Sequence, residues 1–568
     1  MKNKKKIKRK NTVARAVAGR CRAVASFALD RSLSAPALET HNSPCELKQC
    51  VSPLRGRSGA AAAVPSRSAM RPPVPAPPPL SSDPHFTRRN MHMGFFSMSG
   101  ARSLACAFIA VFMLGACAAG PATMDPRTMH FPTQPLAPPQ PKRVVLENGL
   151  VLYLLRDPEV PLVTVQALVR TGAVLEPADK VDLAEITGRA MRTGGTARHT
   201  GPELNMRLES LGASLETGIG RQSGTASLSV LTPDLAVGIE LLAEVLRTPV
   251  FDSAEVERVK RRKIEEIRRG NDAPDAIAFR EFRTAVFGDD PRGRQSSPEM
   301  AAAITREDLV DFHARTFFPD RTMLGVSGLF DEAELLALVR RHFGDWRPAG
   351  APAPVFPVPK RPPQAGVLIA AKDVPQATVI MGHLAPPKDS ADFFAFSVLD
   401  YILGGSGFTS RLTSEIRSDR GLAYSVGSFY RGDIGYGVFG AYCMTKSASA
   451  LEAARLMRGI VERIRTEGVT AGELRRAKDA IVNSLIFSVD GTREVVAQRM
   501  GFAYDGFPDD FLERYRDRVE AVSLEDVRAV AGRFLHTDAL STVVVGEDAA
   551  LAGFDEFGPV KRITLRRY

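Results

Sequence analysis

The chain has 568 residues, 44% of them hydrophobic, which is enough for two or more folded domains with buried cores. Its formal net charge of +11 is misleading, because residues 1–90 hold 18 basic and 4 acidic residues and so carry +14, which leaves −3 for the rest. The basicity therefore gives no support for nucleic-acid binding by the folded part.

Residues 1–97 form a basic, low-complexity extension. The segment opens with MKNKKKIKRK, includes PPVPAPPPL, and shows neither helical nor strand periodicity. It is either a disordered basic arm or the result of a start assigned upstream of the true initiator. Met91, Met93 and Met98 are alternative starts to Met1, and the complete signal peptide that follows them favours the second interpretation.

Residues 98–117 have the features of a lipoprotein signal peptide. Arg102 supplies the basic region, and the apolar run LACAFIAVFML (104–114) has signal length and is short for a membrane span. The next residues, LGAC, resemble the bacterial lipobox, which implies lipidation of Cys117; secretory cleavage without a lipid is the alternative. We therefore expect a lipid-anchored envelope protein. An Asp directly after the lipidated cysteine would retain the protein in the inner membrane, and this chain has Ala118 there. We therefore expect the protein in the outer membrane, facing the periplasm.

Cysteine usage agrees with this processing. Four of the six cysteines precede Cys117 and would be removed with the signal peptide, so we expect no structural disulfide. Cys443 lies in the apparent strand YGVFGAYCM, and we interpret it as a small core residue rather than a nucleophile.

A Pro-rich segment, residues 118–142, follows the signal peptide, and we expect it to be a tether between the anchor and the fold. The Asn-Gly pair at 148–149 stands between the β-rich runs RVVLE and LVLYLLRD and predicts a hairpin. Apolar residues at helical spacing then predict helices over 233–247 and 252–269.

The chain contains a long internal repeat. Residues 304–328 align without gaps on 522–546, and both segments predict a capped helix, a turn and an apolar strand that ends in glycine. A strand and two helices at 223–270 correspond to a strand and two helices at about 436–488. A repeat of this length indicates two similar domains rather than a solenoid. The Pro-rich stretch 347–364 is the expected linker.

Several segments occur in the order typical of one protein family. They are the Asn-Gly hairpin, TGAVLEP with DLAEITGRAMRTGGT, HARTFFPDRTMLGVSG, and GGSGFTSRLTSEIRSDRGLAYSVGS. On these segments the chain, over roughly residues 143–547, resembles the M16 (insulinase or pitrilysin) metallopeptidases. The resemblance implies an α+β fold class with two homologous α/β domains, each a mainly antiparallel sheet with helices packed on one face. Residues 143–346 would form the N-terminal-type domain and 365–548 the C-terminal-type domain.

The zinc motif of that family is degenerate in this chain. The family helix reads G-L-A-H-x-x-E-H, and its three reactive positions are held here by Glu185, Gly188 and Arg189. Gly188 cannot act as a base and Arg189 is a fixed cation, so the resemblance implies no zinc on this chain. Glu266 matches the distal ligand, and we hypothesise that it pairs with Arg189. None of the other candidate histidines forms an i,i+4 pair: His199, His313, His342 and His383.

The second half retains a different family motif. Arg417 and Tyr424, in SEIRSDRGLAYSVGS, match the Arg/Tyr pair that M16 peptidases supply opposite the zinc, where it contacts substrate and helps to stabilise the tetrahedral intermediate. The alternative is that the two residues persist for packing. The glycine-rich stretch 404–407 predicts a helix-to-helix turn rather than a phosphate loop, because no Lys-Ser/Thr follows it.

Some bacterial M16 peptidases are heterodimers in which one subunit carries the zinc motif and the other supplies the Arg/Tyr pair. The resemblance therefore implies a non-catalytic, substrate-binding subunit that is inactive alone. Its partner would be a zinc-bearing M16 subunit, and zinc would be the partner's cofactor, with none on this chain. Peptides or unfolded proteins would be the substrates, held partly by β-strand addition. The alternative is a stand-alone peptide-binding or assembly protein without a proteolytic role.

Overall fold

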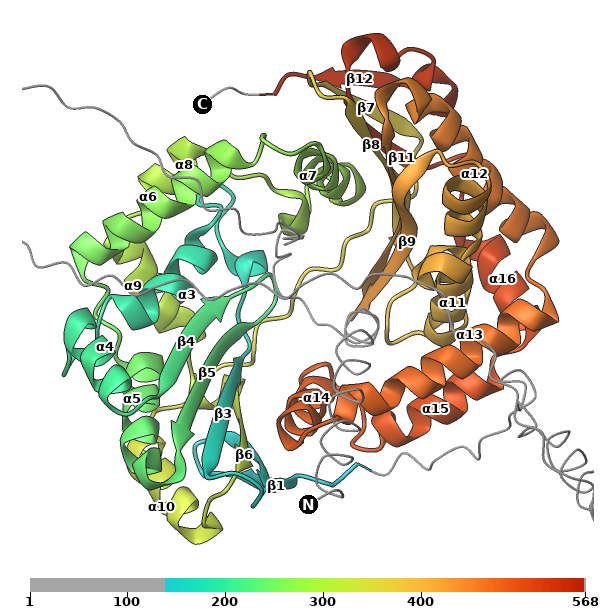
Figure 1. Cartoon of the computed structure of the whole chain (residues 1–568). Coiled ribbons are helices and arrows are strands. Elements are labelled where there is room, and N and C mark those ends of the chain that lie inside the picture. Colours follow the sequence, from blue (N-terminus) through green and yellow to red (C-terminus); the bar gives the residue numbers. More distant parts are fainter. Residues whose placement is uncertain (1–137, 566–568) are drawn as a thin grey trace, which may run out of the picture. The chain divides into compact units, whose positions relative to one another are not determined.

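Two six-stranded β-sheets organise the part of the chain that the structure, a computed structural model, describes: residues 138–565 (Figure 1). The expected extension, the signal peptide with Cys117, and nearly all of the tether lie outside the described residues. Within 138–565, no helix is both long and apolar enough to cross a bilayer.

The first sheet begins with the predicted hairpin. The Leu146 N–H donates to the Leu150 carbonyl at 2.9 Å, and Gly149 has a φ of +87°, which favours glycine. Strand β2 pairs in parallel with β6, and the other neighbours in the order β1-β2-β6-β3-β5-β4 are antiparallel. The strands are Lys142–Val145 (β1), Val151–Arg156 (β2), Leu162–Val169 (β3), Ser214–Ile219 (β4), Gly224–Leu231 (β5) and Thr322–Gly328 (β6).

The second sheet repeats this topology with one difference at its edge. Its order is β12-β7-β11-β8-β10-β9, and β7 pairs in parallel with β11 as β2 does with β6. The edge strand β12 comes from beyond residue 548 and runs parallel to β7, so the second domain extends past the predicted boundary. The strands are Gly366–Ala371 (β7), Gln376–Ala385 (β8), Ala423–Asp433 (β9), Tyr436–Lys446 (β10), Ser541–Gly546 (β11) and Val560–Ile563 (β12).

The helices confirm the internal repeat. α9 and α16 each begin with a capping box, Thr305 with Asp308 and Ser523 with Asp526, and each leads into a strand, β6 or β11. α5 begins at Leu235, slightly later than predicted.

The helices of the first half are Leu183–Thr193 (α3), Gly201–Ser210 (α4), Leu235–Arg247 (α5), Ser253–Arg269 (α6), Pro274–Phe287 (α7), Pro298–Ala303 (α8), Arg306–Thr316 (α9) and Glu332–Phe343 (α10). Those of the second half are Phe393–Asp400 (α11), Ala450–Glu467 (α12), Ala471–Ser484 (α13), Thr492–Tyr504 (α14), Phe511–Ala521 (α15) and Leu524–Phe534 (α16).

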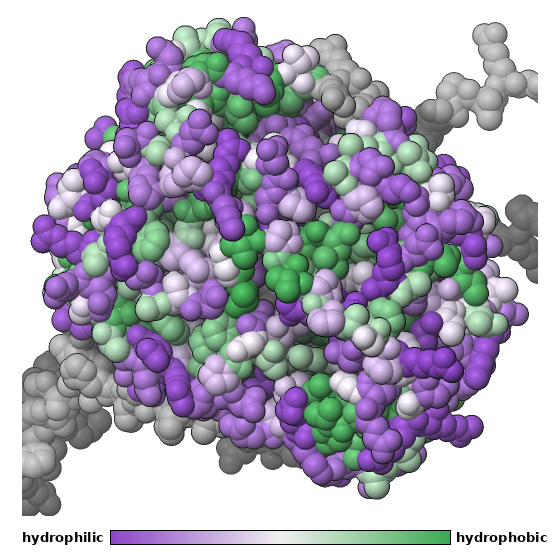
Figure 2. All heavy atoms as spheres, turned by 180° about the vertical axis from the view of Figure 1, so that it is seen from behind, coloured by the Kyte–Doolittle hydropathy of each residue, from purple (hydrophilic) through white to green (hydrophobic). Residues whose placement is uncertain are grey.

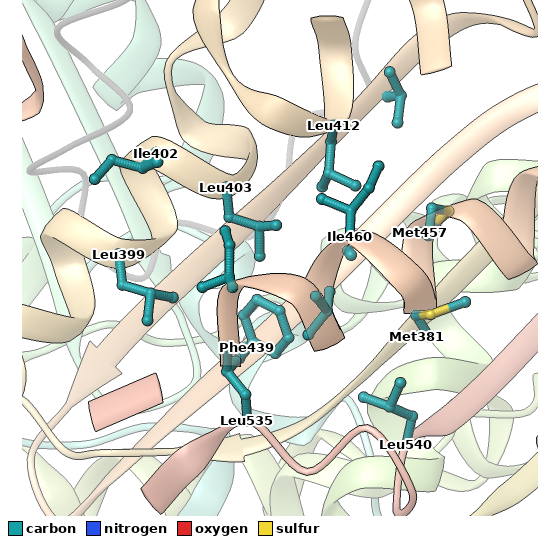
Figure 3. Packing of buried hydrophobic residues seen from close by; sticks show 14 of the residues in the cluster. Met381, Leu399, Ile402, Leu403, Leu412, Phe439, Met457, Ile460, Leu535 and Leu540 are labelled. Carbon is teal, nitrogen blue, oxygen red and sulfur yellow. The ribbon is translucent and has the colours of Figure 1, made fainter. Parts of the chain in front are cut away.

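Each sheet buries a large hydrophobic core against the helices of its own half. In the second core, Leu399, Leu403 and Leu412 converge with Phe439 and Ile460, and all five side chains are fully buried (Figure 3). Each such side chain contributes roughly 1.5–3 kcal/mol. The segment that carries Leu412 is therefore firmly attached to the sheet.

One helix of each half packs on the sheet of the other half. Helix α7 contacts β8 and β11, where Ile277 and Phe282 join a buried cluster. Helix α14 contacts β2 and β6 through Val496 and Met500. A β-carbon on Gly325 of β6 would lie 2.2 Å from the Met500 sulfur, so glycine permits this approach. The resemblance implied helices on one face of each sheet, and this exchange adds one on the opposite face.

The surface carries no single continuous apolar area on the face shown in Figure 2, where hydrophobic residues lie in separate patches among hydrophilic ones. Scattered apolar residues of this kind are ordinary on folded proteins. The functional argument therefore rests on specific side-chain clusters rather than on a broad apolar surface.

Candidate functional site

Helix α3, which carries the degenerate motif, is held at its N-terminus by a buried carboxyl group. Asp182, the N-cap residue, has a φ of +80° and makes no side-chain cap. Instead, Glu176 accepts hydrogen bonds from the N–H groups of Asp182 at 3.3 Å and Ala184 at 2.9 Å. Burial raises the pKa of Glu176 to about 8. With Leu183 and Met191 buried in the core, α3 has a fixed position.

The positions that hold metal ligands in M16 metallopeptidases, the family that the chain resembles, are linked here by ion pairs. Arg189 lies 2.6 Å from Glu185 on the same helix and donates to Glu266 Oε1 on α6 at 2.8 Å, as hypothesised. Lys263 binds Glu185 at 2.6 Å and Asp182 at 3.2 Å. Burial lowers the pKa of Arg189, but its bond to Glu266 and the charge of Glu185 outweigh this and raise it. Glu266, the one family ligand that this chain keeps, and Glu185, which replaces a histidine of the motif, are thus both paired with basic side chains.

Gly188 is in direct contact with strand β4. A β-carbon on Gly188 would lie 2.3 Å from the Ile219 nitrogen and 2.7 Å from the Gly218 carbonyl carbon. Thr217 Oγ1 also donates to the Gly188 carbonyl at 2.7 Å. The position that carries the general base in the resembling family therefore has no space for a side chain.

The residues at this site do not fit zinc. Among the four motif positions, only Glu185 and Glu266 could serve as metal ligands. The positive guanidinium of Arg189 is bound to both of them. Among the described residues, no group of three or more His, Cys, Asp or Glu is placed to hold a metal ion.

The other candidate side chains have structural environments. Burial lowers the pKa of His313 and His383 to about 4, and each ring contacts a backbone carbonyl. His199 lies 2.9 Å from Glu244. Cys443 is fully buried on β10, as expected of a core residue, and burial raises its pKa to about 12.

Arg417 and Tyr424 form a second group, in which Arg417 is half-buried and Tyr424 is exposed. Arg417 lies in a π-helical turn, Thr413–Asp419, and Tyr424 lies near the start of β9. The guanidinium carbon is 5.2 Å from the Tyr424 ring centroid and 4.6 Å from that of Phe408. Tyr424 is 80% exposed and Phe408 70% exposed. Sequence reasoning missed Phe408, although an aromatic residue directly after a glycine-rich turn was a usable signal.

The glycine-rich stretch before this group is a helix-to-helix turn, as predicted. It continues α11 through a π-helical turn, Tyr401–Gly405, and a β-carbon on Gly404 would meet the Ser428 nitrogen at 2.1 Å. Ser428 also donates through its hydroxyl to Asp400 Oδ1 at 2.6 Å, and burial raises the pKa of Asp400 to about 7. The turn is therefore fixed against β9, the strand that carries Tyr424.

The structure thus brings the predicted residues together as two groups. Glu185, Arg189 and Glu266 form one, with Gly188 beside them, and Arg417 with Tyr424 form the other. Among the described residues, no hydrogen bond, ion pair or ring contact joins the two groups.

Comparisons with known proteins agree with both halves. Residues 151–297 match the family model for insulinase (peptidase family M16), and residues 303–481 match that for the peptidase M16 inactive domain. An uncharacterized zinc protease of Mycobacterium bovis is 27% identical over 409 residues, which cover 71% of this chain and 93% of that protein.

Two solved structures share the fold. A peptidase M16 inactive domain from Pseudomonas fluorescens has a TM-score of 0.66 at 22% identity, covering 72% of this chain and 98% of that one. The periplasmic protease PqqL from Escherichia coli has a TM-score of 0.62 at 15% identity, covering 78% of this chain and 50% of that one.

Proposed function

The chain belongs to peptidase family M16, and we propose that it is a non-catalytic, substrate-binding subunit of a heteromeric zinc peptidase. A partner subunit with the intact H-x-x-E-H motif would hold the metal. This chain would supply Arg417 and Tyr424 to the partner's site and part of the surface that holds the peptide.

The observation that carries this proposal is the exposure of the Tyr424 ring beside the half-buried Arg417. A pair kept for packing alone would bury its aromatic ring, whereas the Tyr424 ring is 80% exposed. A guanidinium and a neutral hydroxyl are suitable donors for a peptide carbonyl that gains negative charge. This chain's own motif does not fit zinc. The Arg417–Tyr424 pair can therefore take part in peptide hydrolysis only if a second chain supplies the zinc site.

Two further features support peptide binding. Strands β4 and β9 each form one edge of their sheet, and each adjoins one of the two residue groups. An edge strand can bind an extended peptide through its free backbone groups. The lipobox-like sequence before Cys117 supports a lipid-anchored subunit that faces the periplasm, in agreement with a peptide or unfolded protein as substrate.

A second candidate function is a stand-alone binding or assembly protein without a proteolytic role. The closed ion-pair cluster around Arg189 favours it, because that cluster is a complete structure that needs no metal. A neighbouring reading frame that encodes an M16 chain with H-x-x-E-H would favour the heteromeric peptidase over this alternative.

The test is peptide hydrolysis by the purified chain, by the zinc-bearing partner, and by their mixture. We expect no hydrolysis by this chain alone and the highest rate from the mixture. Arg417→Ala should lower turnover of the mixture by about 10²-fold, the loss usual for an oxyanion-stabilising donor, without changing its zinc content. Arg420→Ala, an exposed arginine three residues further on, is the matched control. Hydrolysis by this chain alone, or equal effects of both variants, would overturn the proposal.

A further inference from the structure

A cavity of about 190 Å³ lies beside the degenerate motif, between α3, α6 and the edge strand β4. Four arginines line it, Arg189, Arg192, Arg258 and Arg262, against one carboxylate, Glu216. The side chains that line the cavity therefore include more positive than negative groups, beside the degenerate motif.

Two of these arginines are already paired. Arg189 is bound by Glu185 and Glu266, as described above, and Arg258 binds Glu255 in an ion pair between the two α6 side chains. They set the charge of the wall but have little capacity left for a ligand.

The other two arginines are held less tightly, Arg192 by a long ion pair and Arg262 by none among the described residues. Arg192 donates to the neutral Asn205 at 2.6 Å, and its nearest carboxylate, Glu216, is 3.7 Å away on a side chain that is 75% exposed. Arg262 forms no ion pair with any described residue. The pKa of Glu255 is lowered first by its hydrogen bond from Arg258, and the charge of Arg262 is the smallest of the contributions to that shift.

We propose that this arginine-lined cavity binds a carboxylate group of a peptide, held between Arg192 and Arg262. Guanidinium groups bind carboxylates through parallel, charge-assisted hydrogen bonds, and a cavity of about 190 Å³ has room for a carboxylate group. Glu216 and Thr217 of β4 line the cavity, and β4 is an edge strand. A peptide that pairs with β4 and ends beside these residues would place its terminal carboxylate in the cavity. The inference deepens the proposed function and rests on it for the choice of a peptide.

The test is calorimetric titration of the full-length chain, without a partner, with two probes. One is acetylated hexa-alanine with a free C-terminal carboxylate, and the other is the same peptide with a C-terminal amide. We expect the acid to bind at least about tenfold more tightly, a difference of about 1.4 kcal/mol, because the amide offers no charge to the two guanidinium groups. Equal binding of the two probes would overturn the proposal.

Arg262→Gln tests whether the preference for the acid arises in this cavity. The substitution removes a charge that has no ion pair with any described residue, so it should leave the fold intact. It should weaken binding of the acid about tenfold and leave binding of the amide unchanged. Arg261→Gln is the matched control: an exposed neighbour on α6, with the same loss of charge, outside the cavity. An equal effect of both variants would show a general charge effect and refute the site.

Inorganic phosphate is the third probe. It distinguishes a site for a peptide carboxylate from a site for free phosphate. Phosphate binding that depends on Arg262, together with no preference for the peptide acid, would identify a phosphate site and overturn the proposal. The measurement needs no zinc-bearing partner, so its failure would leave the hydrolysis test of Arg417 unaffected.

Discussion

Gly188 of α3 lies so close to Ile219 of β4 that a β-carbon on Gly188 would stand 2.3 Å from the Ile219 backbone nitrogen. The loss of the zinc motif is therefore more than a change of three side chains. Helix α3 and strand β4 are in direct contact at the position where the family motif places the general base, and no side chain fits there unless the backbone moves.

We expect that restoring the motif does not restore a metal site. Gly188→Ala should reduce the free energy of unfolding by about 1–3 kcal/mol, because the added methyl group meets backbone atoms that cannot rotate away. The triple variant Glu185→His, Gly188→Glu, Arg189→His should lose more stability and bind no stoichiometric zinc. Urea denaturation and metal analysis measure the two outcomes.

Gly459→Ala is the control for a glycine within a helix. Gly459 lies in α12, where a β-carbon would meet no atom closer than 3.9 Å, so alanine should stabilise the chain by up to about 1 kcal/mol. If Gly188→Ala were equally stabilising, the close contact of α3 with β4 would be wrong.

Much of the fold follows from local sequence signals. The Asn-Gly hairpin, the capping boxes at Thr305 and Ser523 and the repeated helix–strand units each depend on residues that are neighbours in the chain. The exchange of α7 and α14 could not be predicted in this way. The apolar residues of α7 indicate that one face of the helix is buried, but they do not indicate which sheet covers it. Likewise, the sequence of β12 does not indicate which strand it pairs with.

The site shows the same division. The family motif identified Glu185, Arg189 and Glu266. Because that motif places Arg189 and Glu266 at one metal site, their opposite charges suggested that they pair. The contact of Gly188 with Ile219 joins two elements through space, and a glycine in the sequence does not reveal what it touches. The aromatic residue after the glycine-rich turn could have drawn attention to Phe408, but its contact with Arg417 is visible only in the structure.

The Arg189–Glu266 pair should show measurable coupling. Both side chains are partly exposed, so a double-mutant cycle of Arg189→Ala and Glu266→Ala should give about 0.5–1 kcal/mol. A cycle of Arg189→Ala with Glu265→Ala is the control, because Glu265 pairs with Arg268 instead. Strict additivity of the first pair would show that the ion pair contributes nothing in solution.

Phe408 should act as a positioning residue for Arg417. A ring 4.6 Å from the guanidinium restrains it by about 0.5–1 kcal/mol, so Phe408→Ala should lower turnover of the two-subunit mixture several-fold. Because the ring is largely exposed, the free energy of unfolding should change little. Phe408→Tyr keeps the aromatic face and should restore turnover. If tyrosine and alanine gave the same rate, the ring would have no positioning role.

Asp400 should make stability depend on pH. Its pKa is about 7 in the folded chain, because burial disfavours the charged form, against 3.8 in the unfolded chain. Between these values the unfolded chain releases the proton that the folded chain keeps, so stability is fully present below about pH 3.8 and falls as the pH rises to about 7. One such group accounts for up to about 1.4 kcal/mol per pH unit.

Asp400→Asn removes this titration, because asparagine stays neutral and still accepts the hydrogen bond from Ser428. Relative to the wild type, the variant should gain stability steadily as the pH rises from 4 to 7, as measured by urea denaturation at each pH. Asp419→Asn, which removes an exposed carboxylate from the same region, is the control for loss of charge. A constant difference between Asp400→Asn and the wild type would show that Asp400 is already ionised in the folded chain. In that case the turn before Arg417 would contain a buried charge, and Ser428→Ala should then destabilise the chain by more than the roughly 1 kcal/mol of a neutral hydrogen bond.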